Sequence, residues 1–100
     1  MMILSEGFYY VYVLYSEKDY KHYIGYTQNL IVRLAQHENG LVKSTKYRRP
    51  LRLIYFEASL NQKDAIRREN YFKTHYGRMF IKKPLKEYYS TNVQDNIPPG

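Results

Sequence analysis

Five polar side chains spread over residues 12–69 have the chemistry needed to hydrolyse a phosphodiester bond. They are Tyr12, Tyr23, Arg33, His37 and Glu69. A tyrosine beside cations or a metal-bound water can act as a general base, and the planar guanidinium of arginine matches the geometry of phosphate. A histidine can hydrogen-bond a phosphate or hold a tyrosine hydroxyl, and a carboxylate supplies the oxygen that hard divalent cations prefer. These residue types predict cleavage with a single metal ion.

Each of these residues also has an ordinary structural interpretation. Tyr12 and Tyr23 lie on strand-like runs, where aromatic side chains usually pack in the core. Arg33 and His37 are one helical turn apart, and both are typical of a solvated helix surface. The pattern alone leaves the catalytic and the structural interpretations open.

Glu69 combines a sharp chemical signal with a clear alternative. The helical pattern places it between Ala65 and Phe72, in an apolar stripe where a carboxylate is costly unless it is paired or bound to metal. Lys73 follows four residues later, in the order that favours an ion pair on a helix. Metal binding by Glu69 and an ion pair with Lys73 are both consistent with the sequence.

A basic segment in the middle of the chain provides candidate DNA-binding residues. The candidates are Lys43, Lys46, Tyr47, Arg48 and Arg49. Their cations suit a phosphate backbone, and the tyrosine ring suits stacking on an exposed base. The chain has a formal net charge of +7, from 16 lysines and arginines against 9 acidic residues, which favours a polyanionic partner. A charged surface loop without a partner is the alternative.

Residue patterns place the two tyrosines on an antiparallel hairpin. Phe8–Tyr15 is aromatic or aliphatic at every position and predicts a strand covered on both faces. Ser16–Lys21 is polar and turn-like, and His22–Tyr26 predicts the second strand. Gly25 in this strand indicates a bulge or a close approach of another group to the backbone.

Helical patterns follow the hairpin on either side of a third strand. Gln28–Asn39 predicts the first helix, with Thr27 as its N-cap and Gly40 after its end. The expected buried face of this helix is Leu30, Ile31, Leu34 and Ala35. Leu51–Glu57 predicts the third strand, because apolar and polar residues alternate at its start.

Two further helices are expected in the last third of the chain. Asn61 is the predicted N-cap of the second helix, and Gly77 is its predicted end. Arg78–Tyr89 predicts a short third helix, whose start or course Pro84 limits. We interpret residues 1–89 as one domain and residues 90–100, which are polar and rich in proline, as a flexible C-terminal tail.

Composition sets the broad class. Hydrophobic residues make up 44% of the 100 residues, which is typical of a folded domain. There is no cysteine, which excludes disulfides and thiolate metal sites and fits a cytoplasmic protein. The N-terminal residues lack the pattern of a signal peptide, and no apolar run is long enough to span a membrane.

The order of these motifs resembles the GIY-YIG nuclease superfamily. Tyr10-Val11-Tyr12 stands at the place of the first motif, and Tyr23-Ile24-Gly25 is a literal second motif. Arg33 matches the helix arginine of the family, Glu69 its metal-binding glutamate, and His37 a histidine found in some members. The similarity runs from about Phe8 to Lys86 and is greatest to the small standalone bacterial members related to the nuclease module of the excision-repair incision subunit.

The chain departs from the family pattern at four positions. Tyr10 and Val11 replace the glycine and isoleucine of the first motif. Tyr26 stands where the repair nucleases have a lysine, and Ile81 lies near the place of their asparagine.

The resemblance implies an α+β fold, a three-stranded antiparallel sheet with helices packed around it. It also implies an endonuclease that hydrolyses DNA, structured or nicked, with one Mg²⁺ or Mn²⁺ held by Glu69. Tyr23 would activate water or relay its proton, Tyr12 would position the scissile phosphate or the water, and Arg33 would offset developing charge. His37 would orient a tyrosine or the phosphate.

Two other function classes remain open from the sequence. The first is a nucleic-acid binding module with a weak or lost nuclease site. The second is a small protein-interaction domain, which predicts no salt-dependent binding to DNA.

Overall fold

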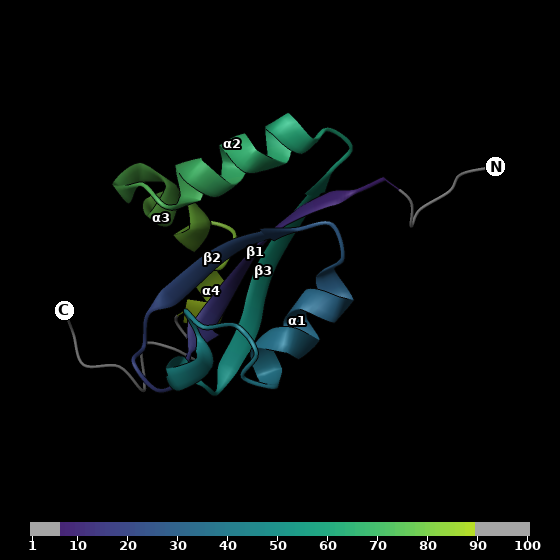
Figure 1. Ribbon diagram of the computed structural model, residues 1–100. Coiled ribbons are helices and arrows are strands. Elements are labelled where there is room, and N and C mark those ends of the chain that lie inside the picture. The colour runs from purple at the N-terminus through teal and green to yellow at the C-terminus, as the bar shows by residue number, and fades with distance from the viewer. Residues whose placement is uncertain (1–6, 90–100) are drawn as a thin grey trace.

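A computed structural model describes residues 7–89, so the predicted tail at residues 90–100 lies outside the described residues. Its centre is a three-stranded antiparallel sheet in the order β2-β1-β3. The strands are β1 (Tyr9–Ser16), β2 (His22–Thr27) and β3 (Leu51–Ser59). Helices cover both faces of this sheet (Figure 1). The predicted fold class is confirmed.

The central strand β1 explains why its sequence is apolar throughout. Successive side chains point to opposite faces, and both faces are covered by helices. Val11 and Val13 face α2 (Gln62–Phe72) and α3 (His75–Lys82), whereas Tyr12 and Leu14 face α1 (Leu30–Glu38). Each face of the sheet therefore has its own cluster of buried side chains.

Helix α1 begins two residues later than the sequence predicted. Its N-cap is Asn29, whose side chain accepts a hydrogen bond from the backbone N–H of Val32. Thr27, the predicted cap, is the last residue of β2, and its hydroxyl accepts from the backbone N–H of Asn29. Gly40 follows the end of the helix with a φ of 73°, a left-handed conformation that glycine adopts readily.

The predicted buried face of α1 was wrong in part. Leu30 is buried and Leu34 half-buried, but Ile31 is 77% exposed and Ala35 is also exposed. The helix instead buries His37, which is 1% exposed. The helix is therefore rotated about its axis relative to the prediction. We attribute the rotation to His37, whose two ring nitrogens have hydrogen-bond partners on the sheet side. Burying Ile31 and Ala35 instead would lose these hydrogen bonds.

The second helix ends earlier than predicted. Asn61 is its N-cap, as expected, and accepts from the backbone N–H groups of Lys63 and Asp64. The helix stops at Phe72, and Thr74 caps α3 by accepting from the N–H of Gly77. Gly77 therefore lies inside α3.

Gly77 is required there by close packing rather than by a helix end. A Cβ at this position would lie 1.9 Å from the carbonyl oxygen of Tyr71, so α3 can approach the end of α2 only without a side chain. A short α4 (Lys86–Tyr88) follows, and η1, a 3-10 turn, spans Lys46–Arg48.

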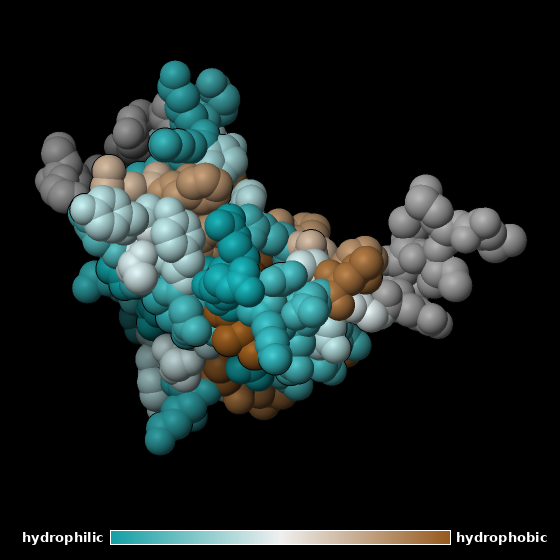
Figure 2. Space-filling model, turned by 90° about the horizontal axis from the view of Figure 1, so that it is seen from above, coloured by the Kyte–Doolittle hydropathy of each residue, from teal (hydrophilic) through white to brown (hydrophobic). Residues whose placement is uncertain are grey.

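The face of the sheet covered by α2 and α3 carries an apolar core. Its buried members are Val11, Val13, Ile24, Ala65, Phe72 and Ile81. Seen from above, the outer surface of the molecule over α2 is mainly hydrophilic, with apolar residues gathered in smaller areas (Figure 2). Within residues 7–89, no helix has the length and hydrophobicity needed to cross a membrane.

Candidate active site

The face covered by α1 contains a buried chain of three hydrogen-bonding side chains. The hydroxyl of Tyr12 lies 2.8 Å from Nε2 of His37, and Nδ1 of His37 lies 2.7 Å from the hydroxyl of Thr45. All three residues are at most 1% exposed. Strand β1, helix α1 and the segment before η1 therefore meet at the His37 ring.

Burial, together with the nearby Arg33 cation, lowers the pKa of His37 to about 4. The imidazole is therefore neutral at physiological pH, with one ring nitrogen donating and the other accepting. The hydroxyls of Tyr12 and Thr45 can take either role, so the chain is satisfied in both tautomers. The hydrogen bonds from Tyr12 through His37 to Thr45 hold the Tyr12 ring in place.

Tyr23 lies beside this chain on the same face of the sheet. Its ring centroid is 5.1 Å from that of His37 and 6.3 Å from that of Tyr12. In contrast to the fully buried Tyr12, Tyr23 is only half-buried. Tyr23 is thus the more accessible of the two tyrosines to water or a substrate.

Arg33 brings a positive charge to both tyrosines. Hydrogen bonding to Tyr12, followed by the electrostatic influence of Tyr12 and Tyr23, raises the pKa of Arg33 further, against the opposite effect of burial. The guanidinium also donates a 3.0 Å hydrogen bond to Oε1 of Gln36, one turn along α1. Arg33 is half-buried, so its charge is fixed near the tyrosines while part of it faces solvent.

The Tyr12 hydroxyl is a weak acid in this setting. Burial raises its pKa above the ordinary value near 10, and the hydrogen-bonding Arg33 guanidinium offsets part of this rise. The neighbouring Tyr23 and Glu69 add to the rise. A buried hydroxyl with a raised pKa that is held by His37 is suited to fixing geometry rather than to removing protons.

Gly25 is the partner of Tyr12 across the β1–β2 ladder. A Cβ on Gly25 would lie 2.3 Å from Cζ and from the hydroxyl oxygen of Tyr12, far inside contact distance. The sequence indicated a close approach at this glycine, and the structure identifies the approaching group as the Tyr12 ring.

Glu69 comes to the site from α2, on the opposite side of the sheet from α1. Its side chain is 19% exposed and forms an ion pair with Lys73, with 3.1 Å between Oε2 and Nζ. The ion pair that the sequence allowed is therefore present. The carboxylate charge adds slightly to the rise in the pKa of Tyr12, after the larger effects of burial and Tyr23.

The single carboxylate of Glu69 is compatible with a Mg²⁺ or Mn²⁺ ion that water and substrate oxygens also ligate. Among residues 7–89, no group of three or more histidine, cysteine, aspartate or glutamate side chains gathers to hold a metal. Magnesium commonly binds through one or two carboxylates, with waters and substrate phosphate oxygens as its other ligands. Glu69 uses only Oε2 in its ion pair and is partly exposed, which suits that arrangement.

The predicted DNA-binding segment divides into two groups. Lys43, Lys46 and Tyr47 are exposed. Arg48, by contrast, forms an ion pair with Asp19, with 2.6 Å between Nε and Oδ2, and donates to backbone carbonyls of the β1–β2 turn. Arg49 donates to the carbonyls of Glu38 and Lys46. Both arginines hold the segment in place.

Thr45 is the site residue that sequence reasoning missed. It lies in a basic, turn-like stretch, eight residues after His37, and no motif or periodicity distinguishes it. Only the folded loop, which returns Val42–Lys46 to the end of α1, brings its hydroxyl to the ring.

The two residues that differ from the family pattern after the second motif, Tyr26 and Ile81, lie on the α2 side of the sheet and not at the tyrosine site. Tyr26 packs with the apolar core under α2, and its hydroxyl accepts a hydrogen bond from Nε2 of Gln62. Ile81 is 2% exposed in the same core.

This combination of sheet, paired tyrosines and helix arginine defines the class of the protein. The chain belongs to the GIY-YIG catalytic domain family, whose match covers residues 8–83.

Within this class the chain is similar to UPF0213 proteins from several bacteria. The chain is 51% identical to one from Pediococcus pentosaceus over 71 residues, which is 70% of this chain and 73% of the relative. It is 37% identical to one from Streptococcus pneumoniae over 87 residues, covering 86% and 81% of the two chains. The solution structure of a UPF0213 protein from Bacillus halodurans matches with a TM-score of 0.50 and 27% identity, covering 86% of this chain and 98% of that one.

Proposed function

We propose that this protein is a metal-dependent endonuclease that hydrolyses DNA phosphodiester bonds. The observation that carries the proposal is the convergence of Tyr23 and Arg33 on the His37–Tyr12 pair. The family supports a catalytic domain. The net charge of +7 supports a nucleic-acid substrate.

The accessible residues of the site take the chemical steps. Tyr23 removes or relays the proton of the attacking water, because it is half-buried and lies next to a fixed cation. Arg33 offsets the negative charge that grows on the phosphate in the transition state. In this proposal, the phosphate and the water lie on the solvent side of Tyr23.

The buried residues hold the accessible ones in position. Tyr12 and His37 are shielded from solvent and bonded to each other, so we assign them to orienting the Tyr23 ring and the Arg33 guanidinium. This narrows the role expected for Tyr12, from direct contact with the phosphate to support of the groups that make the contact.

Glu69 would hold the divalent cation. Such a cation would supply Lewis-acid stabilisation of the charge on the phosphate and on the departing 3′-oxygen. In the absence of substrate, Oε2 of this carboxylate pairs with Lys73.

The proposal extends to the setting of the protein. DNA of distorted structure is the expected substrate and the cytoplasm its location, and the sequence resemblance to the excision-repair branch suggests a repair role. We also propose that residues 1–89 act as one nuclease unit.

Exchanges at Glu69 and Lys73 test the metal assignment against the ion pair. Glu69→Gln keeps the shape but removes the charge, and we expect it to abolish Mg²⁺- or Mn²⁺-dependent cleavage of nicked and branched DNA while DNA binding persists. Lys73→Gln breaks the same ion pair but should leave cleavage near wild type. Asp64→Asn, on the same helix and exposed, is the control for a lost carboxylate.

The outcomes separate three interpretations. Cleavage by a folded Glu69→Gln protein would overturn the metal assignment. Equal behaviour of Glu69→Gln and Lys73→Gln would reduce Glu69 to an ion-pair residue. Salt-dependent DNA binding without cleavage by the wild type would favour the binding module, which the Glu69–Lys73 pair and the absence of the family lysine at Tyr26 also support.

A further inference from the structure

A cavity of about 740 Å³ opens between α1, the β1–β2 turn and the η1 segment. Its size falls within the range of ligand sites in proteins, about 300–1,000 Å³. Four leucines from β1, α1 and β3 contribute its apolar part, namely Leu14, Leu34, Leu51 and Leu53. The proposed chemistry uses none of these residues.

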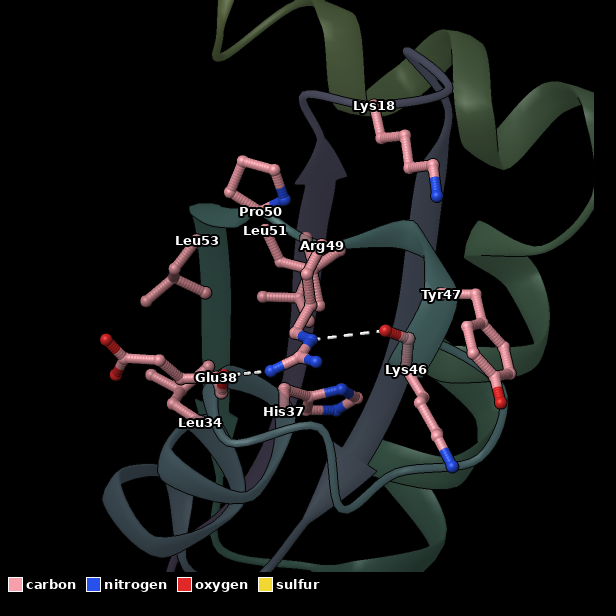
Figure 3. Close-up of a pocket in the computed structure, with 11 residues that line it drawn as sticks. Lys18, Leu34, His37, Glu38, Lys46, Tyr47, Arg49, Pro50, Leu51 and Leu53 are labelled. Atoms are coloured by element: carbon pink, nitrogen blue, oxygen red, sulfur yellow. Dashed lines mark hydrogen bonds between the residues drawn. The ribbon is translucent and has the colours of Figure 1, made fainter.

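The cavity shares a wall with the candidate active site. His37 lines it, and the same ring contacts Tyr12 and Tyr23. A group in the cavity would therefore lie one side chain away from the proposed base. Figure 3 shows His37 directed toward the cavity from the α1 side.

The rim of the cavity is cationic. Lys18, Lys46 and Arg49 line it, against a single carboxylate from Glu38. In Figure 3 the Glu38 carboxylate points away from the Arg49 guanidinium. An apolar interior with a positive rim is complementary to a flat apolar ring that is linked to phosphates.

The residues that line the cavity include two with flat side-chain groups, Tyr47 and Arg49. Tyr47 is 74% exposed, with the Lys46 ammonium 5.1 Å from its ring centroid. The Arg49 guanidinium is fixed by two backbone hydrogen bonds, 3.0 Å to Glu38 and 3.1 Å to Lys46, which appear as dashed lines in Figure 3. Nucleobases stack both on aromatic rings and on arginine planes.

We propose that this cavity receives one unpaired nucleobase of the DNA strand, with Lys18 and Lys46 on the neighbouring phosphates. Because a base must leave its duplex to enter, the preferred substrate would be DNA with a flap, bulge or other unpaired nucleotide beside the cut. This proposal deepens the nuclease function proposed above and rests on it only for the position of the cut.

Binding without cleavage tests the proposal. Full-length Glu69→Gln protein is titrated, without divalent metal, with a duplex carrying a flap whose first unpaired base is the fluorescent 2-aminopurine. The fully paired duplex of the same sequence is the reference. We expect the flap DNA to bind roughly 5- to 100-fold more tightly, with quenching of the 2-aminopurine.

Two tyrosines of equal exposure give a matched control. Tyr47→Ala should remove both the preference and the quenching, and Tyr47→Phe should keep both. Tyr76 is also 74% exposed but lies on α3, and Tyr76→Ala should change neither. Lys18→Gln should weaken binding to flap DNA and lower its log–log salt slope by about 1.

The proposal is overturned if Tyr47→Ala retains the flap preference, or if Tyr76→Ala loses it equally. Tighter binding of an RNA flap than of the DNA flap would overturn the assignment to DNA. Flap preference in a wild-type protein that never cuts would support the cavity and refute the nuclease. Cleavage without any flap preference would support the nuclease and overturn the assignment of the cavity to a nucleobase.

Discussion

The two faces of the sheet are built from alternating residues of the same strands, yet they stabilise the molecule in different ways. Under α2 and α3, Val13, Phe72 and their neighbours pack as apolar side chains without specific partners. Under α1, Tyr12, His37 and Thr45 are as fully buried but depend on defined hydrogen bonds. Burial on the first face needs only volume and hydrophobicity, whereas on the second it also needs geometry.

The edges of the two faces repeat this contrast. Beside the apolar face, Arg68 pairs with Glu57 at 2.7 Å and lies 4.6 Å from the Phe72 ring centroid, joining α2 to β3. Beside the polar face, the Arg33 guanidinium interacts with the hydroxyls of Tyr12 and Tyr23. We therefore expect changes among the apolar core residues under α2 to alter stability first, and changes at Tyr23 and Arg33 on the other face to alter activity first.

The largest effect should come from the apolar face. Phe72 is fully buried, and Phe72→Ala removes its transfer free energy and leaves a cavity. We expect a loss of about 3–5 kcal/mol in the free energy of unfolding, measured by urea denaturation. If the loss is below 1 kcal/mol, the α2 face does not dominate stability and the comparison fails.

Tyr23→Phe should have a comparable effect on rate but little on stability. The ring remains in place, but the hydroxyl that takes or relays the proton of water is lost. We expect a loss of about 10²–10⁴ in the rate of cleavage at neutral pH, with partial recovery at higher pH as hydroxide replaces the base.

Melting temperatures of the wild type, Tyr23→Phe and Tyr12→Phe provide the control for this comparison. Tyr12→Phe should melt lower than Tyr23→Phe, because it leaves Nε2 of His37 buried without its partner. Normal cutting by Tyr23→Phe would make Tyr23 a packing residue.

The sequence predicted the elements of the apolar face better than those of the polar face. Runs of β-branched and aromatic residues and the Asn61 cap are local signals, and they placed three strands and the start of α2 correctly. The rotation of α1 could not be found in this way. The apolar residues of α1 dominate its local pattern, so that pattern does not indicate that His37 is buried. The hydrogen-bond partners that bury His37 are Tyr12 and Thr45, which lie outside the helix.

Long-range contacts also decide which candidate residues are accessible. The sequence grouped Arg48 with its basic neighbours, but Asp19, 29 positions earlier, holds its guanidinium. The sequence left Glu69 open between metal binding and an ion pair, and the structure adds the pair with Lys73 without testing the metal.

Gly25→Ala should combine the effects of Phe72→Ala and Tyr23→Phe, because the substitution should lower both the stability of the fold and the activity of the site. The new methyl group must displace the Tyr12 ring from its place over the backbone. We expect a loss of about 2–3 kcal/mol in stability and a disproportionate loss of activity. A crystal structure of the variant with the Tyr12–His37 hydrogen bond unchanged would contradict this.

Thr45→Val should cost about 1–2 kcal/mol in stability, because Nδ1 of His37 loses its partner in a site closed to water. Thr45→Ser, which keeps the hydroxyl, should retain most of that stability. A loss in Thr45→Val no larger than that in Thr45→Ser would show that the hydroxyl contributes little to stability.

The smallest effect should be the pH dependence from His37. Its folded pKa, about 4, is below the unfolded value near 6.5, so the unfolded state takes up the proton first as the pH falls. The stability from neutral His37 is complete above pH 6.5 and is lost between pH 6.5 and 4. From pH 7 to 5.5 we expect a loss of about 1 kcal/mol.

His22 shifts in the same direction and must be separated from His37. Burial, with nearby cations, also lowers its pKa to about 4. Urea midpoints of His37→Asn and His22→Asn across this pH range should each show a shallower dependence than wild type. An unchanged slope in His37→Asn would show that its ring protonates freely in the fold.

The contact between Gly25 and the Tyr12 ring also has a genetic consequence. Since one residue occupies the space that the other leaves, the two motif positions should not vary independently. In a library randomised at both positions and selected for folded protein, substitutions of Gly25 should survive mainly together with a smaller residue at position 12. Such suppressors would restore the fold but not the nuclease, because the ring that supports His37 would be gone.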